Sequence, residues 1–269
     1  MVNIQHEPQA GNKDRVQSPF RDGTAEDRAA WIKLCNLQRR ILPQAAPPVR
    51  GYRQVLAYRP AFVVTGDYHD FFLRPDGKAA TFVGDGSGHG PAASMLMAIM
   101  RTLLHTHDVH REPAEMLTAV GRMFHQLIPS DLFMTGVYLL LGGDGRVSWA
   151  AAGHHPPLWI NRAGQLAPID DHLGAVGQPL GICSEEDYTT VTWQLERGDR
   201  LLLFTDGLWE ARDPLGEKFG RQRLCEHLAE TVSLSLDEMV QRLVDRVAAH
   251  LERADFEDDF TVVAVERQE

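Results

Sequence analysis

The segment FFLRPDGKAATFVGDGSGHGPAASMLMA (residues 71–98) carries the pattern that decides the fold. Two apolar runs flank the turn PDGK (75–78), and Asp-Gly between apolar runs is typical of a β-hairpin. A glycine-rich loop then leads to Pro91, a residue favoured in the first turn of a helix. The Ala/Met/Leu stretch that follows predicts a helix to about Thr106. Antiparallel strands followed by a helix favour a layered α+β domain.

The same signals recur on both sides of this segment. Thr24 and Asp27 resemble a capping box and predict a helix that ends before Pro43. Further helices are expected between Pro113 and Pro129, near 220–232, and near 235–253. We expect one more hairpin turning at 142–145 and another at 196–199, the latter joining YTTVTWQL to LLLFTDG, and a last strand, FTVVAVER (260–267).

Composition excludes several classes of protein. The chain has 269 residues, 43% of them hydrophobic, and a net charge of −10, which is typical of an ordinary globular protein and disfavours nucleic-acid or acidic-membrane partners. The cysteines form no CxxC pattern, so neither a disulfide framework nor a zinc site is expected. No signal peptide and no apolar run of about 20 residues is present, so we predict a cytoplasmic protein.

The chain divides by composition into three parts. Residues 1–23 are rich in polar residues, Pro and Gly, and predict a disordered tail. Residues 24–50 predict a linker helix and a Pro-rich turn, and residues 51–269 predict the main globular domain.

Aspartates stand at the ends of apolar strands. Asp85 ends ATFVG and Asp206 follows LLLFT, positions where a lone buried carboxylate would be costly. Two acidic pairs lie at other strand edges: Asp67 with Asp70, and Asp258 with Asp259. Any one of these residues can be a strand-end cap or a turn former. Together they favour an oxygen-only site for a hard divalent cation such as Mg²⁺ or Mn²⁺.

Six motifs, in order along the chain, resemble those of the bacterial SpoIIE/RsbU-like phosphatases, a branch of the metal-dependent type 2C (PPM) serine/threonine phosphatases. They are GDYHDFF (66–72), GDGSGHGPAASMLMA (84–98), AAGHHPPLW (151–159), GQPLG (177–181), GDRLLLFTDGLWEARDPLGEKFG (198–220) and DDFTVV (258–263). The resemblance covers residues 37–267, because LQRRILP (37–43) is similar to the linker helix of the family. With the paired helices, it implies a four-layer αββα sandwich of two mostly antiparallel sheets flanked by helix pairs.

The resemblance also implies roles for individual residues. Asp85 resembles the carboxylate that bridges two metal ions, with the Gly86 carbonyl holding one of them. Asp206 and Asp258 resemble the other direct ligands. Asp67 matches an aspartate that acts directly or through metal-bound water. Asp259 is expected to orient its neighbour.

This set implies a protein serine/threonine phosphatase with two Mn²⁺ or Mg²⁺ ions. Two such ions lower the pKa of a bridging water, which attacks phosphorus in line without a covalent phosphoenzyme. The catalytic set would be Asp67, Asp85, Asp206 and Asp258, acting through metal-bound water. By analogy, the phosphorylated protein substrate is an anti-sigma-factor antagonist or a similar signalling regulator of a partner-switching pathway.

Several features leave alternatives open. His89 either protonates the leaving alkoxide or braces its loop through a backbone hydrogen bond. The helix at 24–42 either packs on the domain or forms a homodimer. Thr65, Gly86, Ala151 and His155 depart from residues common in the family, but none of these changes removes a carboxylate. A catalytically silent phosphoprotein-binding module and a metal-independent regulator are the competing functions.

Overall fold

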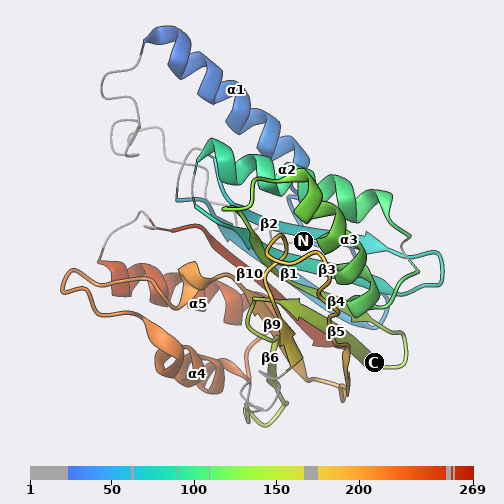
Figure 1. Cartoon of the computed structure of the whole chain (residues 1–269). Coiled ribbons are helices and arrows are strands. Elements are labelled where there is room, and N and C mark those ends of the chain that lie inside the picture. Colours follow the sequence, from blue (N-terminus) through green and yellow to red (C-terminus); the bar gives the residue numbers. More distant parts are fainter. Residues whose placement is uncertain are drawn as a thin grey trace.

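A computed structural model describes residues 24–61, 64–88, 90–108, 110–166, 175–252, 256 and 258–269. Two β-sheets lie face to face at the centre, and helices cover the outer face of each (Figure 1). The α+β class and the αββα layering predicted above are therefore confirmed. The expected tail at 1–23 and His89 lie outside the described residues.

Sheet A has four antiparallel strands in the order β1-β10-β9-β6. Their bounds are Tyr52–Arg59 (β1), Phe260–Arg267 (β10), Arg200–Phe204 (β9) and Leu158–Ile160 (β6). Strand β9 is buried along its whole length because it has strand neighbours on both edges and packed layers on both faces. Sheet A therefore joins an early strand to the last one.

Sheet B has six strands, of which four follow one another as β2-β3-β4-β5. The bounds are Asp67–Leu73 (β2), Ala79–Gly86 (β3), Met134–Leu141 (β4), Arg146–Ala152 (β5), Val176–Gly177 (β7) and Val191–Gln194 (β8). The β2–β3 and β4–β5 pairs are the hairpins predicted at 75–78 and 142–145. Strand β7 adds to β5 in parallel, and β8 pairs with β5 antiparallel.

Two helices pack on each sheet, and their bounds agree with the signals in the sequence. They are α2 (Pro91–Thr106) and α3 (Pro113–Leu127) on sheet B, and α4 (Gly220–Thr231) and α5 (Leu236–Leu251) on sheet A. A proline begins α2 and α3, and Ser235 caps α5 in a capping box with Glu238. Separate apolar clusters fill the space between each helix pair and its sheet, and a third lies between the sheets.

The third predicted hairpin is wrong. The chain does turn at 196–199, where the Asp199 amide donates to the Glu196 carbonyl, but β8 and β9 do not pair. Strand β8 alternates between half-buried and exposed residues and suits the edge of sheet B. Strand β9 is apolar from Leu201 to Phe204 and enters the interior of sheet A. The turn at 196–199 thus carries the chain from one sheet to the other.

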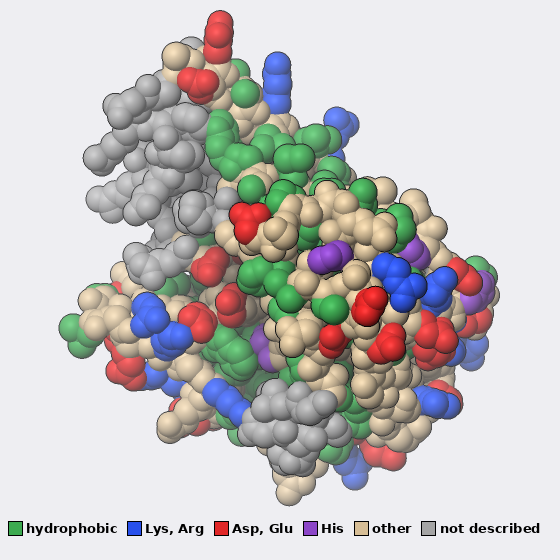
Figure 2. Space-filling view, viewed as in Figure 1, with side chains coloured by type: hydrophobic (Ala, Val, Ile, Leu, Met, Phe, Trp, Pro, Cys, Tyr) green, Lys and Arg blue, Asp and Glu red, His purple; other side chains and the backbone are tan. Residues whose placement is uncertain are grey.

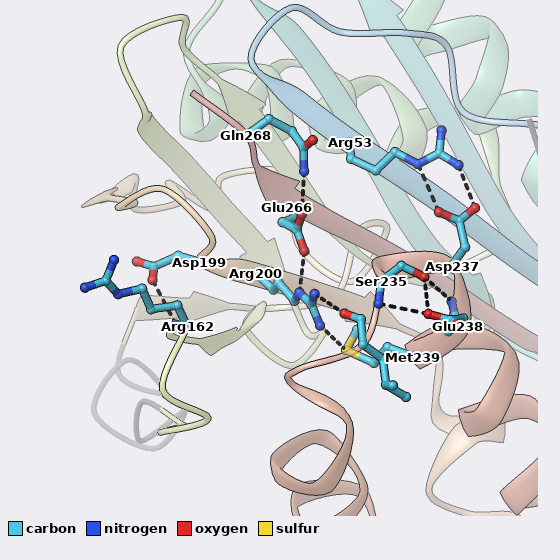
Figure 3. Close-up of polar contacts among 11 residues, drawn as sticks. Arg53, Arg162, Asp199, Arg200, Ser235, Asp237, Glu238, Met239, Glu266 and Gln268 are labelled. Atoms are coloured by element: carbon cyan, nitrogen blue, oxygen red, sulfur yellow. Dashed lines mark hydrogen bonds and ion pairs between the residues drawn. The ribbon is translucent and has the colours of Figure 1, made fainter.

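Two arginines fasten the N-terminal end of α5 to sheet A (Figure 3). Arg53 on β1 forms an ion pair with Asp237 at 2.6 Å. Arg200 on β9 pairs with Glu266 at 2.6 Å and donates a second hydrogen bond to the Leu234 carbonyl. Arg200 is only 6% exposed, so the charge is compensated inside the protein rather than by water.

The N-terminal end of helix α1 (Ala25–Ile41) extends away from the sandwich (Figure 1), and the helix lies near the body from Trp31, beside Gly90, to its C-terminal end. The capping box predicted for Thr24 and Asp27 is present. At the other end Gln38 and Leu42 are buried in the body of the protein. Among the described residues, no helix has both the length and the apolar character needed to cross a membrane.

Candidate metal centre

The four predicted carboxylates come from the same edge of the two sheets. Asp67 begins β2 and lies directly opposite Asp85 near the end of β3, so their side chains share one face of sheet B. Asp206 follows β9 and opens a short 3₁₀ turn, Asp206–Leu208, labelled η2. Asp258 immediately precedes Asp259 and β10. The convergence of strand ends that the sequence suggested is therefore present.

Asp67 is the most deeply buried of the four. It is 1% exposed, and its Oδ2 accepts hydrogen bonds from the hydroxyls of Thr205, at 2.8 Å, and Thr261. Both threonines belong to the sheet A side, so these bonds cross from one sheet to the other. Burial, together with the charges of Asp259 and Asp85, raises the pKa of Asp67 well above its usual range.

Asp259 supports the loop that leads into β2. Its carboxylate accepts from the Thr65 hydroxyl, from the Gly66 amide at 3.1 Å and from the Ala61 amide at 2.9 Å. Thr65 also accepts from the Asp67 amide through its Oγ1. Asp259 therefore holds the segment that leads to Asp67.

Asp85 lies in an environment of like charge. Burial, followed by the charges of Asp206, Asp258 and Asp259, raises its pKa to about 8. Asp206 is an exposed residue, yet partial burial of its carboxylate and the charge of Asp258 also raise its pKa. The charged groups that shift the pKa of Asp85 are all carboxylates. A bound cation would compensate this excess of negative charge.

Oxygen atoms from β3 flank a small space beside Gly66. A Cβ placed on Gly66 would lie 2.8 Å from the Gly86 carbonyl oxygen and 3.4 Å from Asp85 Oδ1. Ala93 Cβ lies 3.0 Å from the same position, so only glycine fits this cradle between a carbonyl, a carboxylate and α2. Oxygen donors of these two kinds are the ligands that Mg²⁺ and Mn²⁺ prefer, so the residues present fit a hard divalent cation.

The cradle is not a closed cage of side chains. Within the described ranges, no group of three His, Cys, Asp or Glu side chains is arranged to hold a metal ion by itself. Hard cations take part of their ligand set from carbonyls and water. The space-filling view in Figure 2 shows acidic side chains, in red, beside the hollow between the two halves of the molecule.

A glycine brings Asp206 and Asp258 together. Gly207 is buried in η2, and a Cβ there would overlap the backbone carbonyl of Asp259. Only a residue without a side chain allows the 206–208 turn to approach the 258–259 segment so closely. This contact explains why glycine follows the aspartate at 206.

Not every singled-out acidic residue belongs to this centre. The Asp70 carboxylate lies elsewhere, between β2 and α2, where it pairs with Arg101 and accepts from the Tyr68 hydroxyl at 2.6 Å. His105 contacts the same carboxylate at 2.8 Å. Asp70 therefore holds α2 on sheet B. His89 lies outside the described residues, and its predicted role stays untested.

Sequence reasoning missed the threonines that support the carboxylates. Thr65, Thr205 and Thr261 are each 0% exposed. A signal does exist, since two of them stand one or two residues before an aspartate of the site, in TGD (65–67) and TD (205–206). Their bonds to partners more than a hundred residues away follow only from the packing of the two sheets.

Two histidines of the AAGHHPPLW motif lie behind the centre. His154 bridges the sheets, since Nε2 donates to the Phe204 carbonyl at 2.8 Å and Nδ1 contacts the Thr135 hydroxyl at 2.9 Å. The ring of His155 stacks on Phe204 with centroids 4.0 Å apart. Both have depressed pKa values because of burial, that of His154 being about 4. The bonds of His154 give it a structural role, since they connect the two sheets.

Comparison with known proteins agrees with this arrangement. The family model described as Stage II sporulation protein E (SpoIIE) matches residues 75–268. Over 87% of its length the chain is 28% identical to phosphoserine phosphatase RsbU of Bacillus subtilis, of which it covers 68%. It is 27% identical to protein IcfG of a Synechocystis species over 95% of its length, but spans only 44% of that relative.

A solved structure has the same fold. The PP2C domain of SiaA from Pseudomonas aeruginosa superposes with a TM-score of 0.75 at 20% identity, covering 90% of this chain and 97% of that domain. The matched family model spans most of the chain, including Asp85, Asp206 and Asp258. The chain therefore belongs to the SpoIIE family, within the RsbU-like branch of the PPM serine/threonine phosphatases.

Proposed function

We propose that this protein is a metal-dependent serine/threonine phosphatase that hydrolyses phosphoserine and phosphothreonine in a protein substrate. The observation that carries the proposal is the convergence of Asp67 and Asp85 from sheet B with Asp206 and Asp258 from sheet A. Burial and the charges of neighbouring carboxylates raise the pKa of Asp67, Asp85 and Asp206. The Gly86 carbonyl and a carboxylate oxygen of Asp85 lie beside the cradle at Gly66. Family membership supports the same chemistry.

In this proposal Asp85 and the Gly86 carbonyl hold the cations on the sheet B side, and Asp206 and Asp258 hold them on the sheet A side. Asp67 acts directly or through water. When bound, two Mn²⁺ or Mg²⁺ ions would supply a nucleophilic water at neutral pH and neutralise phosphoryl charge.

The chain's own contribution is to fix the positions of these ligands. The Thr205 and Thr261 hydroxyls both bind Oδ2 of Asp67, which leaves Oδ1 of that carboxylate for the centre. Asp259 holds Ala61, Thr65 and Gly66 through hydrogen bonds, and Gly207 sets the approach of Asp206 to Asp258. Because Asp67 is held by buried hydrogen bonds, it needs little reorganisation when phosphate charge arrives. His89 remains a candidate to protonate the leaving alkoxide.

The proposed substrate is a phosphorylated anti-sigma-factor antagonist or a similar signalling regulator. Support comes from the relative RsbU, whose name describes a phosphoserine phosphatase. We also propose a homodimer through residues 24–42. Helix α1 exposes two large apolar side chains to water: Ile32 is 60% exposed and Leu37 is 56% exposed. Exposed apolar side chains on one helix are typical of an interaction surface.

The test is phosphate release from an aryl phosphate and from a phosphoserine protein, with Mn²⁺, with Mg²⁺ and with a chelator. Asp85→Asn and Asp206→Asn should each abolish release, whereas Asp187→Asn, an exposed aspartate on the α3 side, should leave it unchanged. Release that survives chelation would contradict the mechanism. Tight binding of the phosphoprotein without any release would instead favour a silent binding module.

A further inference from the structure

A small cavity adjoins the candidate metal centre on the sheet A side. Its volume is about 190 Å³, which equals that of about six molecules of liquid water. Gly207 and Asp258 line it, and Gly207 lies against the backbone of the 258–259 segment. The cavity and the centre therefore share a wall, and the space is large enough for a tetrahedral oxyanion with hydration water.

The lining of this cavity suits a charged ligand. More of the lining is polar than apolar, and its charged side chains are those of Glu210, Arg212 and Asp258. The apolar residues on the deep side are Ala211 and Leu251, which are 8% and 1% exposed. A dry apolar wall lowers the local dielectric constant, so it strengthens an electrostatic interaction made in front of it.

Both carboxylates of the lining have a cation to compensate them. Glu210 forms an ion pair with Lys218 at 2.7 Å. Asp258 is a proposed ligand of the metal ions, whose charge would compensate its own. With both carboxylates accounted for, the charge of Arg212 decides which ligand the cavity prefers, and that ligand is an anion.

Arg212 has hydrogen-bond donors to spare. Its Nη1 donates to the Gly216 carbonyl at 2.9 Å. Within the part of the chain that the structure describes, no carboxylate forms an ion pair with this guanidinium, although Glu210 and Asp258 line the same cavity. Open space rather than an ion pair thus separates Arg212 from Asp258. A guanidinium has five N–H donors in a planar fork, which matches two oxygens of a phosphoryl group.

We propose that Arg212 binds a phosphoryl group in this cavity, beside Asp258. This inference rests on the proposed phosphatase function. The ligand is either the phosphoryl group of phosphoserine before hydrolysis or the inorganic phosphate after it, since both carry the oxygens that a guanidinium binds in pairs. Arg212 would then neutralise phosphoryl charge from the cavity side, as a phosphate-binding residue and not as a metal ligand.

The experiment is a calorimetric titration of inorganic phosphate into the protein loaded with Mg²⁺. The wild-type protein should bind phosphate, and Arg212→Gln should weaken binding about 10- to 100-fold, the range for a hydrogen bond to a charged group. This variant keeps an N–H donor for the Gly216 carbonyl but loses the charge. Arg212→Lys keeps the charge without the planar fork, so its affinity should fall between the two.

Arg122→Gln is the matched control, because Arg122 is an exposed arginine on α3 that lines a different cavity. It should bind phosphate as the wild-type protein does. The affinity of Arg212→Gln for Mg²⁺ should also be unchanged. A loss of Mg²⁺ affinity would mean that the substitution damages the centre, and equal phosphate affinity in the wild-type and Arg212→Gln proteins would mean that Arg212 does not touch the ligand. Either result would overturn the inference.

Aryl-phosphate kinetics distinguish the two sources of the phosphoryl group. If Arg212 binds the substrate, Arg212→Gln should lower kcat/KM and also weaken inhibition by phosphate. If it binds only the product, kcat/KM should stay the same while the inhibition constant of phosphate rises. Both results support the subsite, whereas an unchanged inhibition constant would contradict it.

Failure of the phosphatase proposal is distinguishable from failure of this one. If the wild-type protein does not hydrolyse the aryl phosphate with Mn²⁺ or Mg²⁺, the phosphatase proposal fails. The phosphate titration then reports on the cavity alone. Binding that is weakened by Arg212→Gln but not by Arg122→Gln would support the anion site, and the absence of phosphate binding would overturn it.

Discussion

The side-chain amide of Gln38 pairs with both backbone groups of Thr65. Nε2 donates to the Thr65 carbonyl at 2.7 Å, and the Thr65 amide donates to Oε1 at 2.9 Å. Gln38 lies near the end of α1, and Thr65 binds Asp259 through its hydroxyl. A single buried side chain therefore connects the projecting helix to the loop that supports the candidate metal centre.

Gln38→Ala should weaken this connection. Two buried backbone groups would lose their partner, at a cost of about 1–3 kcal/mol in the free energy of unfolding. Urea unfolding measures that cost, and hydrogen exchange should show faster opening of α1 and of residues 64–66. Asn36→Ala, exposed two residues earlier, is the control. Equal stability of both variants would mean that these hydrogen bonds contribute nothing measurable.

Gly207→Ala should disturb both stability and the centre. The added methyl group overlaps the Asp259 carbonyl, so the 206–208 turn must move away from the 258–259 segment. We expect a loss of about 1–3 kcal/mol in unfolding free energy and weaker Mn²⁺ affinity, measured by calorimetric titration. Gly143→Ala is the matched control, because nothing lies within 4 Å of its Cβ position. Unchanged affinity in Gly207→Ala would refute the close approach.

Asp85 should make the metal-free protein less stable as the pH rises. Its folded pKa of about 8 exceeds the usual 3.8, so folding takes up a proton between these values. The stabilisation is therefore complete below about pH 4 and is lost as the pH rises toward 8. In the presence of a chelator, Asp85→Asn should reduce the change in unfolding free energy between pH 4 and pH 8 by more than ~1 kcal/mol.

The same variant should lose the response to metal. Mn²⁺ is expected to raise the thermal midpoint of the wild-type protein at pH 7.5, because the ion binds the folded state and compensates the clustered carboxylates. Asp85→Asn should show little or no shift. A midpoint that rises equally in both proteins would place the ion somewhere other than at Asp85.

His154 should remain neutral across the physiological range. Burial lowers its pKa to about 4, below the 6.5 of an unfolded chain. Its contribution to stability is therefore intact above about pH 6.5 and falls as the pH drops toward 4. NMR titration of its ring protons should show no transition between pH 5.5 and 8. A transition near 6.5 would mean that the bridge between Thr135 and Phe204 is open in solution.

The proposed homodimer predicts a change of mass. Ile32→Glu and Leu37→Glu place charges on the exposed apolar side chains of α1 and should give a monomer by light scattering. Leu73→Glu, at a comparably exposed position outside α1, should not alter the mass. If the wild-type protein is already monomeric, α1 does not form this interface under the conditions tested.

Local signals predicted most of the fold. Thr24 with Asp27, and the prolines at 91 and 113, begin helices where expected, because caps and prolines act within one turn. The hairpin at 196–199 was wrong because a turn in the sequence does not say which strands pair on either side of it. Pairing depends on burial, which differs between β8 and β9. The division at residue 51 stays a prediction.

The sequence predicted the carboxylates of the candidate site but not the contacts that hold them. Carboxylates at strand ends are visible in the sequence, and the family resemblance assigns them roles. The bonds of Thr205 and Thr261 to Asp67 cross between the sheets, and the Gly207 contact depends on the 258–259 segment. Such contacts arise only when distant segments pack, so the threonines beside the aspartates are visible in the sequence but their partners are not. Their residue types are too common to stand out alone.

Strand β10 lies between β1 and β9, so the earliest strand of sheet A pairs with the last. Chains emerge from the ribosome N-terminus first, so β1 lacks its partner β10 until residues 260–267 have emerged. Asp258 arrives only just before them. A ribosome that stalls earlier thus carries a nascent chain with no assembled centre, and translation itself times when this protein can first act.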